Sequence, residues 1–76
     1  MDNIKRLSDL DVGDIGILVS LPERQSVKNK LMNLGFTKGT RIECIGKSPL
    51  GDPSAFLIRG GVVALRREDC FEIFID

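Results

Sequence analysis

The amino-acid sequence predicts a small, mainly β barrel of about five short strands with one short inserted α-helix. Three observations indicate this fold class: runs of alternating apolar residues, tight-turn signals rich in Gly and Pro between them, and a single stretch with helical spacing at about residues 23–34. The chain of 76 residues is too short for two packed sheets, and closure of one bent sheet removes exposed strand edges. We therefore expect a single domain over residues 1–76.

The first strand and the helix come before residue 35. Apolar residues alternate along the strand and are assigned to one of its faces: Ile15, Ile17, Val19 and Leu21. Pro22 ends this strand and suits the first turn of the helix. Within residues 23–34 one helix face carries Val27, Leu31 and Leu34. Gly35 then stands where a left-handed C-terminal cap is expected, and Phe36 is placed to fold back on the last turn.

The second strand is expected over residues 40–47, and Ser48-Pro49-Leu50-Gly51 fits a type I turn after it. The next two strands are separated by Gly60-Gly61, which is typical of a two-residue hairpin loop. That loop would set Leu57 opposite Ala64 and Arg59 opposite Val62. On this register the core face of the hairpin carries Phe56, Ile58, Val63 and Leu65, and the outer face carries Leu57, Val62 and Ala64 between Arg59 and Arg66.

The C-terminal part is expected to hold a polar turn and a last strand. Residues 67–69 fit one turn of 3₁₀ helix, and apolar residues alternate after it at Phe71, Ile73 and Ile75. The whole order is then a strand, a helix and four short strands joined by tight turns. This order is that of an SH3-like barrel with one inserted helix.

Composition excludes several classes of function. Eleven Lys and Arg balance 11 Asp and Glu, so no bulk charge attracts a nucleic acid or an anionic membrane. The chain has no His, and Cys44 and Cys70 are isolated from each other in sequence, which leaves no zinc site and no convergent iron site. We expect both cysteines to be buried, reduced thiols. No residues are arranged for acid–base or nucleophilic catalysis, so we expect no enzyme activity and no cofactor.

Nothing in the sequence predicts membrane insertion or secretion. Charged residues interrupt the first apolar residues, and no apolar run approaches the ~18–20 residues of a membrane span. We therefore expect a soluble cytoplasmic protein.

Four motifs, taken together and in order, resemble the FeoA proteins of bacterial ferrous iron transport. The first is Leu7-Ser8-Asp9-Leu10 before the Gly13 turn, and the second is the helix end that runs from Leu31 to Thr40. The others are residues 48–53 and Ala64-Leu65-Arg66-Arg67-Glu68-Asp69. The match extends from about residue 7 to residue 75. It implies an SH3-like domain.

The resemblance also implies a function. FeoA proteins are cytoplasmic accessory proteins of the membrane GTPase transporter FeoB, so the expected partner is the cytoplasmic region of FeoB, which would recruit the chain to the inner face of the membrane. Similar domains also form the C-terminal part of iron-dependent transcriptional repressors. A homo-oligomeric regulatory domain of that kind is the alternative function.

Two groups of residues are candidates for partner contact. One is the loop of Pro49, Leu50, Gly51, Asp52 and Pro53, where two prolines limit the entropy lost on binding. The other is the outer hairpin face with its arginines: Leu57, Arg59, Val62, Arg66 and Arg67. The plainer interpretations are a rigid connection for the loop, solvated side chains for the arginines, and cover by the helix for the outer face. If the helix instead caps one open end of the barrel, the outer face is exposed and is a candidate interface for FeoB or a second copy.

Overall fold

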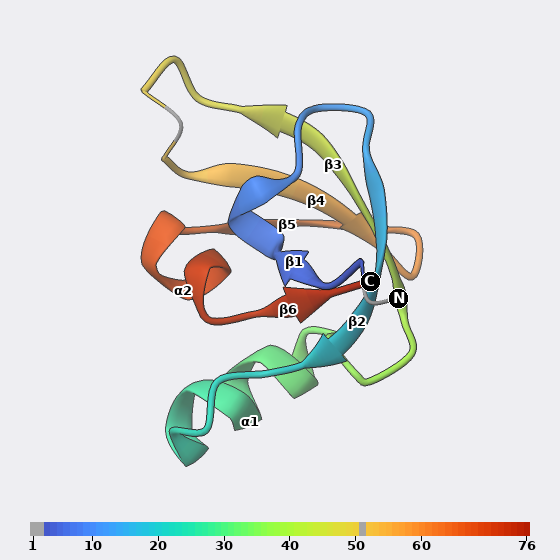
Figure 1. Ribbon diagram of the computed structural model, residues 1–76. Helices are drawn as coiled ribbons and strands as arrows, with labels where there is room; N and C mark the ends of the chain where they lie inside the picture. Colours follow the sequence, from blue (N-terminus) through green and yellow to red (C-terminus); the bar gives the residue numbers. More distant parts are fainter. Residues whose placement is uncertain (1–2, 51) are drawn as a thin grey trace.

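The structure is a computed structural model that describes residues 3–50 and 52–76. Its elements follow the chain as β1 Lys5–Arg6, a 3₁₀ helix η1 Leu7–Asp9, β2 Ile15–Ser20, α1 Gln25–Asn33, β3 Arg41–Lys47, β4 Ser54–Ile58, β5 Gly61–Leu65, α2 Arg67–Phe71 and β6 Phe74–Ile75 (Figure 1). The strands form one six-stranded sheet in the order β1-β6-β2-β3-β4-β5, and every pair is antiparallel. The mainly β class with an inserted helix is confirmed.

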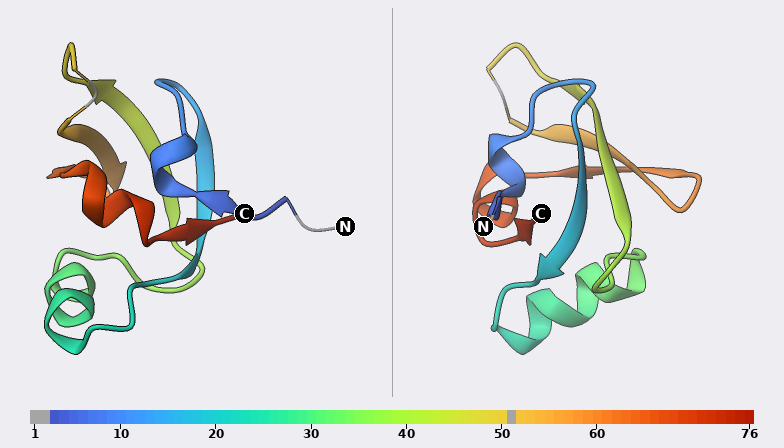
Figure 2. Two further views of the ribbon diagram at one scale, coloured as in Figure 1. Left: turned by 60° about the vertical axis from the view of Figure 1, so that its left-hand side comes forward. Right: turned by 45° about the vertical axis from the view of Figure 1, so that its right-hand side comes forward.

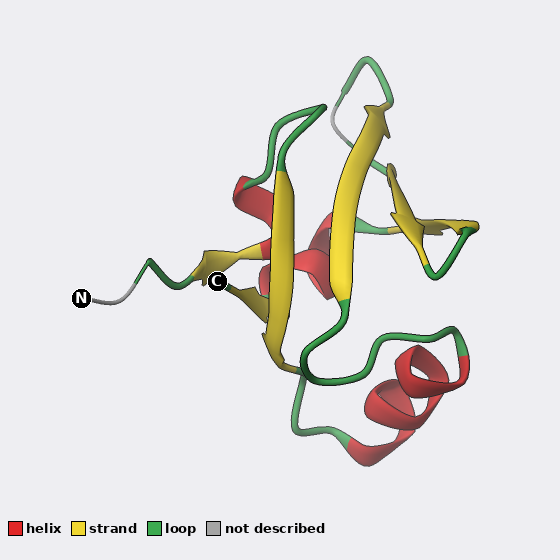
Figure 3. Cartoon of the chain, turned by 90° about the vertical axis from the view of Figure 1, so that its right-hand side faces the viewer, coloured by secondary structure: helices red, strands yellow, loops and turns green. Residues whose placement is uncertain are grey.

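The sheet bends strongly around one core, and α1 lies beyond one end of the strands (Figures 2 and 3). The buried apolar side chains come from every part of the chain: Leu7, Leu10, Leu18, Leu31, Phe36, Ile42, Cys44, Phe56, Ile58, Leu65, Cys70, Ile73 and Ile75. Both cysteines are therefore core residues, as expected, and both are free thiols. Because α1 packs at the end of the barrel, it leaves the outer hairpin face uncovered, and Val62 is 65% exposed.

β2 turns its other face to the core. Gly16 and Leu18 are buried, whereas Ile15 and Ile17 are 47% and 41% exposed. The reason is the close approach of β6 to this strand: a Cβ built at Gly16 would lie 2.5 Å from Cδ1 of the fully buried Ile75. Only Gly fits there, so Ile15 and Ile17 stand on the exposed face of the strand. Val19 and Leu21, which continue the same alternation, are half-buried.

Helix α1 begins at Gln25, two residues later than predicted, with extended Arg24 as its N-cap. Its C-terminal cap is as predicted. Gly35 has a φ of 103°, its N–H donates to the Met32 carbonyl oxygen, and the Phe36 N–H donates to that of Leu31, which is the Schellman arrangement. Leu31 and Phe36 are buried, but Leu34 is exposed and does not share the core face. No helix in residues 3–50 and 52–76 is long and apolar enough to cross a bilayer.

The hairpin loop lies one residue earlier than predicted. Its two residues are Arg59 and Gly60, with φ values of 50° and 80°, which is a type I′ turn. Leu57 therefore pairs with Val62 and Phe56 with Val63. Arg59 tolerates the left-handed backbone because its side chain is held in place: it donates to the carbonyl oxygen of Gly35 at 3.4 Å and to Oγ1 of Thr37 at 3.0 Å. Moving the loop by one residue shifts the partner of each β4 residue by two positions along β5. Because that shift is even, every residue stays on the predicted inner or outer face of the hairpin.

The C-terminal part differs most from the prediction. Residues Arg67–Phe71 form a helix, α2, rather than a turn, and β6 is only Phe74–Ile75. Ile73 and Ile75 are both buried, but Phe71 ends the helix and is 52% exposed. The helix allows Cys70 to reach the core in place of Phe71.

Candidate partner-binding groove

A groove of about 650 Å³ lies between the loop that follows β3, helix α2 and the start of α1. Its lining comes from these three segments: Asp52 from the loop, Arg67, Glu68, Phe71 and Glu72 from α2 and its C-cap, and Arg24 from the N-cap of α1. We call this set the α2 groove. Phe71 also borders two further hollows, one with Leu21 and Phe74 and one with Ser8 and Cys70.

Hydrogen bonds join the loop that follows β3 to helix α2 on one side of the α2 groove. The Arg67 backbone N–H donates to Oδ1 of Asp52 at 3.0 Å, and the Arg67 guanidinium donates to the Leu50 carbonyl oxygen at 2.9 Å. The loop is further closed by the Asp52 N–H, which donates to Oγ of Ser48 at 2.9 Å. These bonds hold Leu50 on a fixed loop while its side chain is 85% exposed. An apolar residue held in this way loses little entropy on binding.

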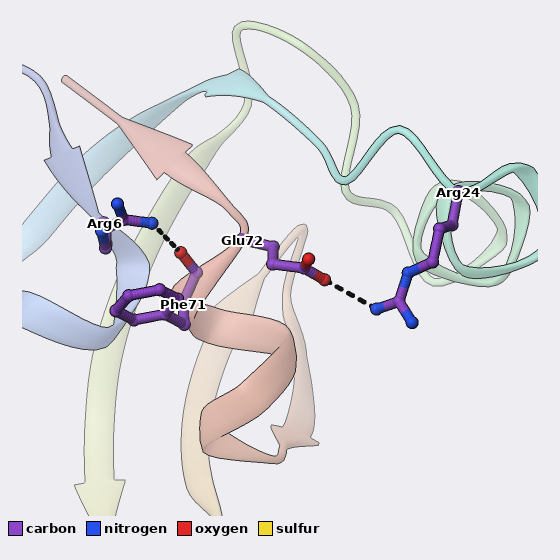
Figure 4. Close-up of polar contacts among 4 residues, drawn as sticks. All are labelled: Arg6, Arg24, Phe71 and Glu72. Atoms are coloured by element: carbon purple, nitrogen blue, oxygen red, sulfur yellow. Dashed lines mark hydrogen bonds and ion pairs between the residues drawn. The ribbon is translucent and has the colours of Figure 1, made fainter.

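Phe71 is fixed by Arg6 (Figure 4). The Arg6 guanidinium carbon lies 3.9 Å from the centroid of the Phe71 ring, and Nη1 of the same side chain donates to the Phe71 carbonyl oxygen at 2.6 Å. The guanidinium also lies 4.9 Å from the Phe74 ring. A cation over an exposed aromatic face contributes about 0.5–1 kcal/mol. The contact therefore favours one position of the Phe71 ring, and the residue stays 52% exposed.

On the side of α1, an ion pair between Arg24 and Glu72 forms part of the α2 groove. Their Nη2 and Oε1 atoms are 2.7 Å apart, and both side chains are exposed (Figure 4). An exposed pair of this kind contributes about 0–1 kcal/mol. A partner can therefore break it and pair with either side chain at small cost.

The buried Cys70 thiol of α2 is chemically quiet. Burial, followed by the negative charges of Asp69 and Asp52, raises the pKa of Cys70 to about 12. The thiol is thus protonated at neutral pH and is a poor nucleophile. Within residues 3–50 and 52–76 no group of three or more Cys, Asp or Glu side chains is placed to hold a metal ion. The arrangement suits noncovalent contact with another macromolecule.

The structure divides the predicted contact residues into two places. Asp52 and Arg67 line the α2 groove, with Leu50, Pro49 and Pro53 exposed on the adjoining loop. Leu57 and Val62 lie opposite each other on the outer hairpin face, with Arg59 in the turn at one end of β5 and Arg66 just after the other end. Gly51 lies outside the described residues, so its part in the type I turn stays a prediction.

Sequence reasoning missed the main aromatic residue of the site. The sequence pattern places Phe71 on a last strand, in alternation with Ile73 and Ile75, and predicts no role for Arg6, Arg24 or Glu72. One signal was available for Phe71. The run Arg67-Glu68-Asp69 places acids in a first helical turn, as helix N-termini prefer, and a helix there rotates Phe71 away from Cys70.

The model of the FeoA domain matches residues 5–76. The chain belongs to the FeoA family. It is 34% identical over 71 residues to the Fe(2+) transport protein A/Fe(2+) transporter FeoB fusion protein of Porphyromonas gingivalis, a match that covers 93% of this chain. The chain spans only 8% of the length of that relative. This match confirms the resemblance to the FeoA family that the four sequence motifs indicated.

Solved structures confirm the SH3-like fold. The FeoA-like protein of Clostridium acetobutylicum superposes with a TM-score of 0.89 at 28% identity, over 100% of this chain and 88% of that one. The FeoA of Stenotrophomonas maltophilia, described as a procaryotic SH3 domain protein and solved with zinc, gives 0.82 at 24% identity, over 95% and 89% of the two chains. A manganese-dependent transcriptional repressor shares the fold, with a TM-score of 0.88 at 13% identity over 99% of this chain and 42% of that one.

Proposed function

We propose that this FeoA chain is an accessory protein of ferrous iron uptake that acts from the cytoplasm by binding the cytoplasmic region of FeoB through the α2 groove. The observation that carries the proposal is the Porphyromonas gingivalis relative, whose name joins an Fe(2+) transport protein A and the transporter FeoB in one fusion protein. Joining two modules in one chain raises their effective concentration to about the millimolar range. A cell gains from such a fusion when the two modules work in contact.

The chemistry of the α2 groove supports a protein partner. Interface hot spots are enriched in aromatic residues and Arg, and the α2 groove combines Phe71 with Arg24 and Arg67. Leu50 adds a second exposed apolar side chain beside it. Both anchors are held before binding, Phe71 by Arg6 and Leu50 through the bonds of Arg67. Preformed anchors lower the entropic cost of association.

Titration calorimetry of the purified chain with the cytoplasmic region of FeoB from the same organism tests the proposal. We expect a saturable one-to-one complex at moderate salt. Because five of the six residues that line the α2 groove are charged, salt should screen their ion pairs with the partner, and the affinity should fall as the salt concentration rises from 50 to 300 mM. Absence of binding to both the GDP-loaded and the GTP-analogue-loaded forms of FeoB would contradict the proposal.

The alternative function, a homo-oligomeric regulatory domain, has one observation in its favour. One row of residues crosses the outer face of the sheet from β2 to β5, and each residue pairs with the next on the neighbouring strand: Ile15, Glu43, Leu57 and Val62. Ile15 and Val62 are exposed at its two ends, and exposed apolar faces mark interaction sites. Its test is the mass of the purified chain in solution. A concentration-independent monomer would leave FeoB binding as the function.

A further inference from the structure

The free edge of β5 is the strongest unused feature of the molecule. β5 is the last strand in the sheet order, and in the part of the chain that the structure describes it pairs with β4 alone. The type I′ turn at Arg59 and Gly60 makes Ile58 and Gly61 a hydrogen-bonded pair. Hydrogen-bonded and non-hydrogen-bonded pairs alternate along an antiparallel ladder. The N–H and C=O groups of Gly61, Val63 and Leu65 therefore face β4, and those of Val62 and Ala64 face outward.

Within β5 itself, this edge carries neither the charge nor the proline that usually protects an exposed strand from pairing. Its sequence is Gly-Val-Val-Ala-Leu, without a charge or a proline, whereas exposed edges are normally blunted by Lys, Pro or a bulge. Its register with β4 is continuous from Ser54–Leu65 to Ile58–Gly61. The residues with outward backbone groups, Val62 and Ala64, are also exposed. Only an extended backbone presents donors and acceptors at the matching spacing.

We propose that β5 is a strand-addition site, which takes an extended segment of the partner protein with small apolar side chains at alternate positions and an acidic residue near each end. This inference rests on the proposed function, since it describes how a segment of FeoB would bind. β5 leads through Arg66 directly into α2 (Figure 1). A strand added to β5 therefore continues toward the wall of the α2 groove.

The charges around β5 decide between a partner segment and a second copy. Arg59 stands at one end of the strand, and Arg66 and Arg67 stand at the other. Antiparallel self-pairing about Val63 joins every outward group of Val62 and Ala64 to the other copy. It brings Arg66, which is still extended, beside the turn of Arg59 and Gly60 of the second copy at both ends. Like charges placed opposite each other destabilise strand pairs. A segment with acidic ends pairs with the same arginines favourably.

The acidic residue of the outer sheet face lies away from this edge. Glu43 is on β3, opposite Leu57, and is separated from β5 by the whole of β4. Arg59 is exposed and already oriented by Gly35 and Thr37 through its Nε and Nη2 atoms. Nη2 also donates to Oγ1 of Thr40 at 3.4 Å. These bonds hold the Arg59 guanidinium against the segment before β3, beside the turn that precedes β5.

The test compares a backbone change with a side-chain change at one position, using the cytoplasmic region of FeoB as the probe. Ala64→Pro removes the outward N–H but no bond to β4, and an edge strand tolerates proline there. Ala64→Ser changes the side chain and keeps the N–H. We expect Ala64→Pro to weaken binding about tenfold or more and Ala64→Ser less than twofold. Circular dichroism and the melting temperature check that both variants are folded.

Amide hydrogen exchange keeps the test decisive if Ala64→Pro does not fold. In the free wild-type chain, the amides of Val62 and Ala64 should exchange at least tenfold faster than those of Val63 and Leu65. In the complex with FeoB they should become protected to a similar degree. If wild type binds FeoB but neither amide gains protection, the strand-addition site is wrong while the proposed function stands. If wild type does not bind at all, the proposed function is wrong. A symmetric dimer that protects both amides without FeoB would also overturn the inference.

Discussion

The Arg6 guanidinium lies 3.9 Å from the centroid of the Phe71 ring and donates a 2.6 Å hydrogen bond to the carbonyl oxygen of the same residue. Two residues separated by 65 positions are thus joined twice, once through the ring and once through the backbone. The pairing connects β1 with the end of α2. It limits the positions open to an exposed aromatic residue.

Phe71→Ala should weaken FeoB binding about tenfold or more, because removal of a central aromatic anchor typically costs about 2 kcal/mol or more. The free energy of unfolding should change by less than about 1 kcal/mol, since half of the side chain is already exposed. Val12→Ala is the matched control, because Val12 is a 58% exposed apolar residue that does not line the α2 groove. Calorimetry and chemical unfolding measure both effects. Equal binding by the two variants would remove Phe71 from the interface.

Gly16→Ala should destabilise the fold by about 1–3 kcal/mol, because the new methyl group would meet the buried Ile75 side chain. Gly46→Ala is the control within another strand, where the nearest atom to the added Cβ is 3.9 Å away. That variant should be neutral or slightly more stable, since Gly weakens strands. Urea unfolding of the two variants tests the explanation of the β2 face. A Gly16→Ala variant as stable as wild type would contradict it.

Val62→Lys should leave the fold intact, because Val62 is 65% exposed at the outer hairpin face. The free energy of unfolding is expected to stay within about 0.5 kcal/mol of wild type. If the outer face joins two copies, sedimentation should show wild-type dimers that the variant lacks. An unfolded variant would place Val62 in the core and contradict the structure.

Stability should fall as the pH rises above 9. Burial raises the pKa of Cys70 from its ordinary value of 9.0 to about 12, so between these values the unfolded chain releases the thiol proton while the folded chain keeps it. The folded state binds more protons there, and stability decreases by up to about 1.4 kcal/mol per pH unit. Cys70→Ala should lack this component. Unfolding of both proteins at pH 8 and pH 10 gives the comparison, and equal pH dependence would show that the thiol is not buried.

The sequence predicted the order of most elements because each has a local cause. Alternation marked the strands, and Gly35 with Phe36 marked the helix end that the Schellman bonds close. The inner hairpin residues Phe56 and Ile58 were also placed correctly, since the face of a strand depends only on the parity of the register. Chain length, alternation and turn chemistry were therefore sufficient to predict the fold class.

The errors arose where distant contacts override local patterns. The inward face of β2 depends on β6, which is almost sixty residues away and needs a residue without a side chain at Gly16. The hairpin loop begins at Arg59 because Gly35 and Thr37 hold that side chain. Phe71 leaves the core because α2 forms and Cys70 takes the place under it. The pattern of residues within one strand does not reveal contacts with distant parts of the chain. Of the residues that line the α2 groove, the sequence therefore predicted only Asp52 and Arg67.

The most direct test of the account is an amide NMR spectrum of the labelled chain, recorded before and after addition of the cytoplasmic region of FeoB. We predict that the largest shifts or losses of signal fall on Asp52, on residues 67–72 and on Arg24, with smaller changes along β5. Signals from Val12 and from the exposed side of α1 should stay unchanged. A spectrum that does not change, or one in which the changes avoid α2 and the loop before β4, would contradict the claim that this FeoA chain binds FeoB through the α2 groove.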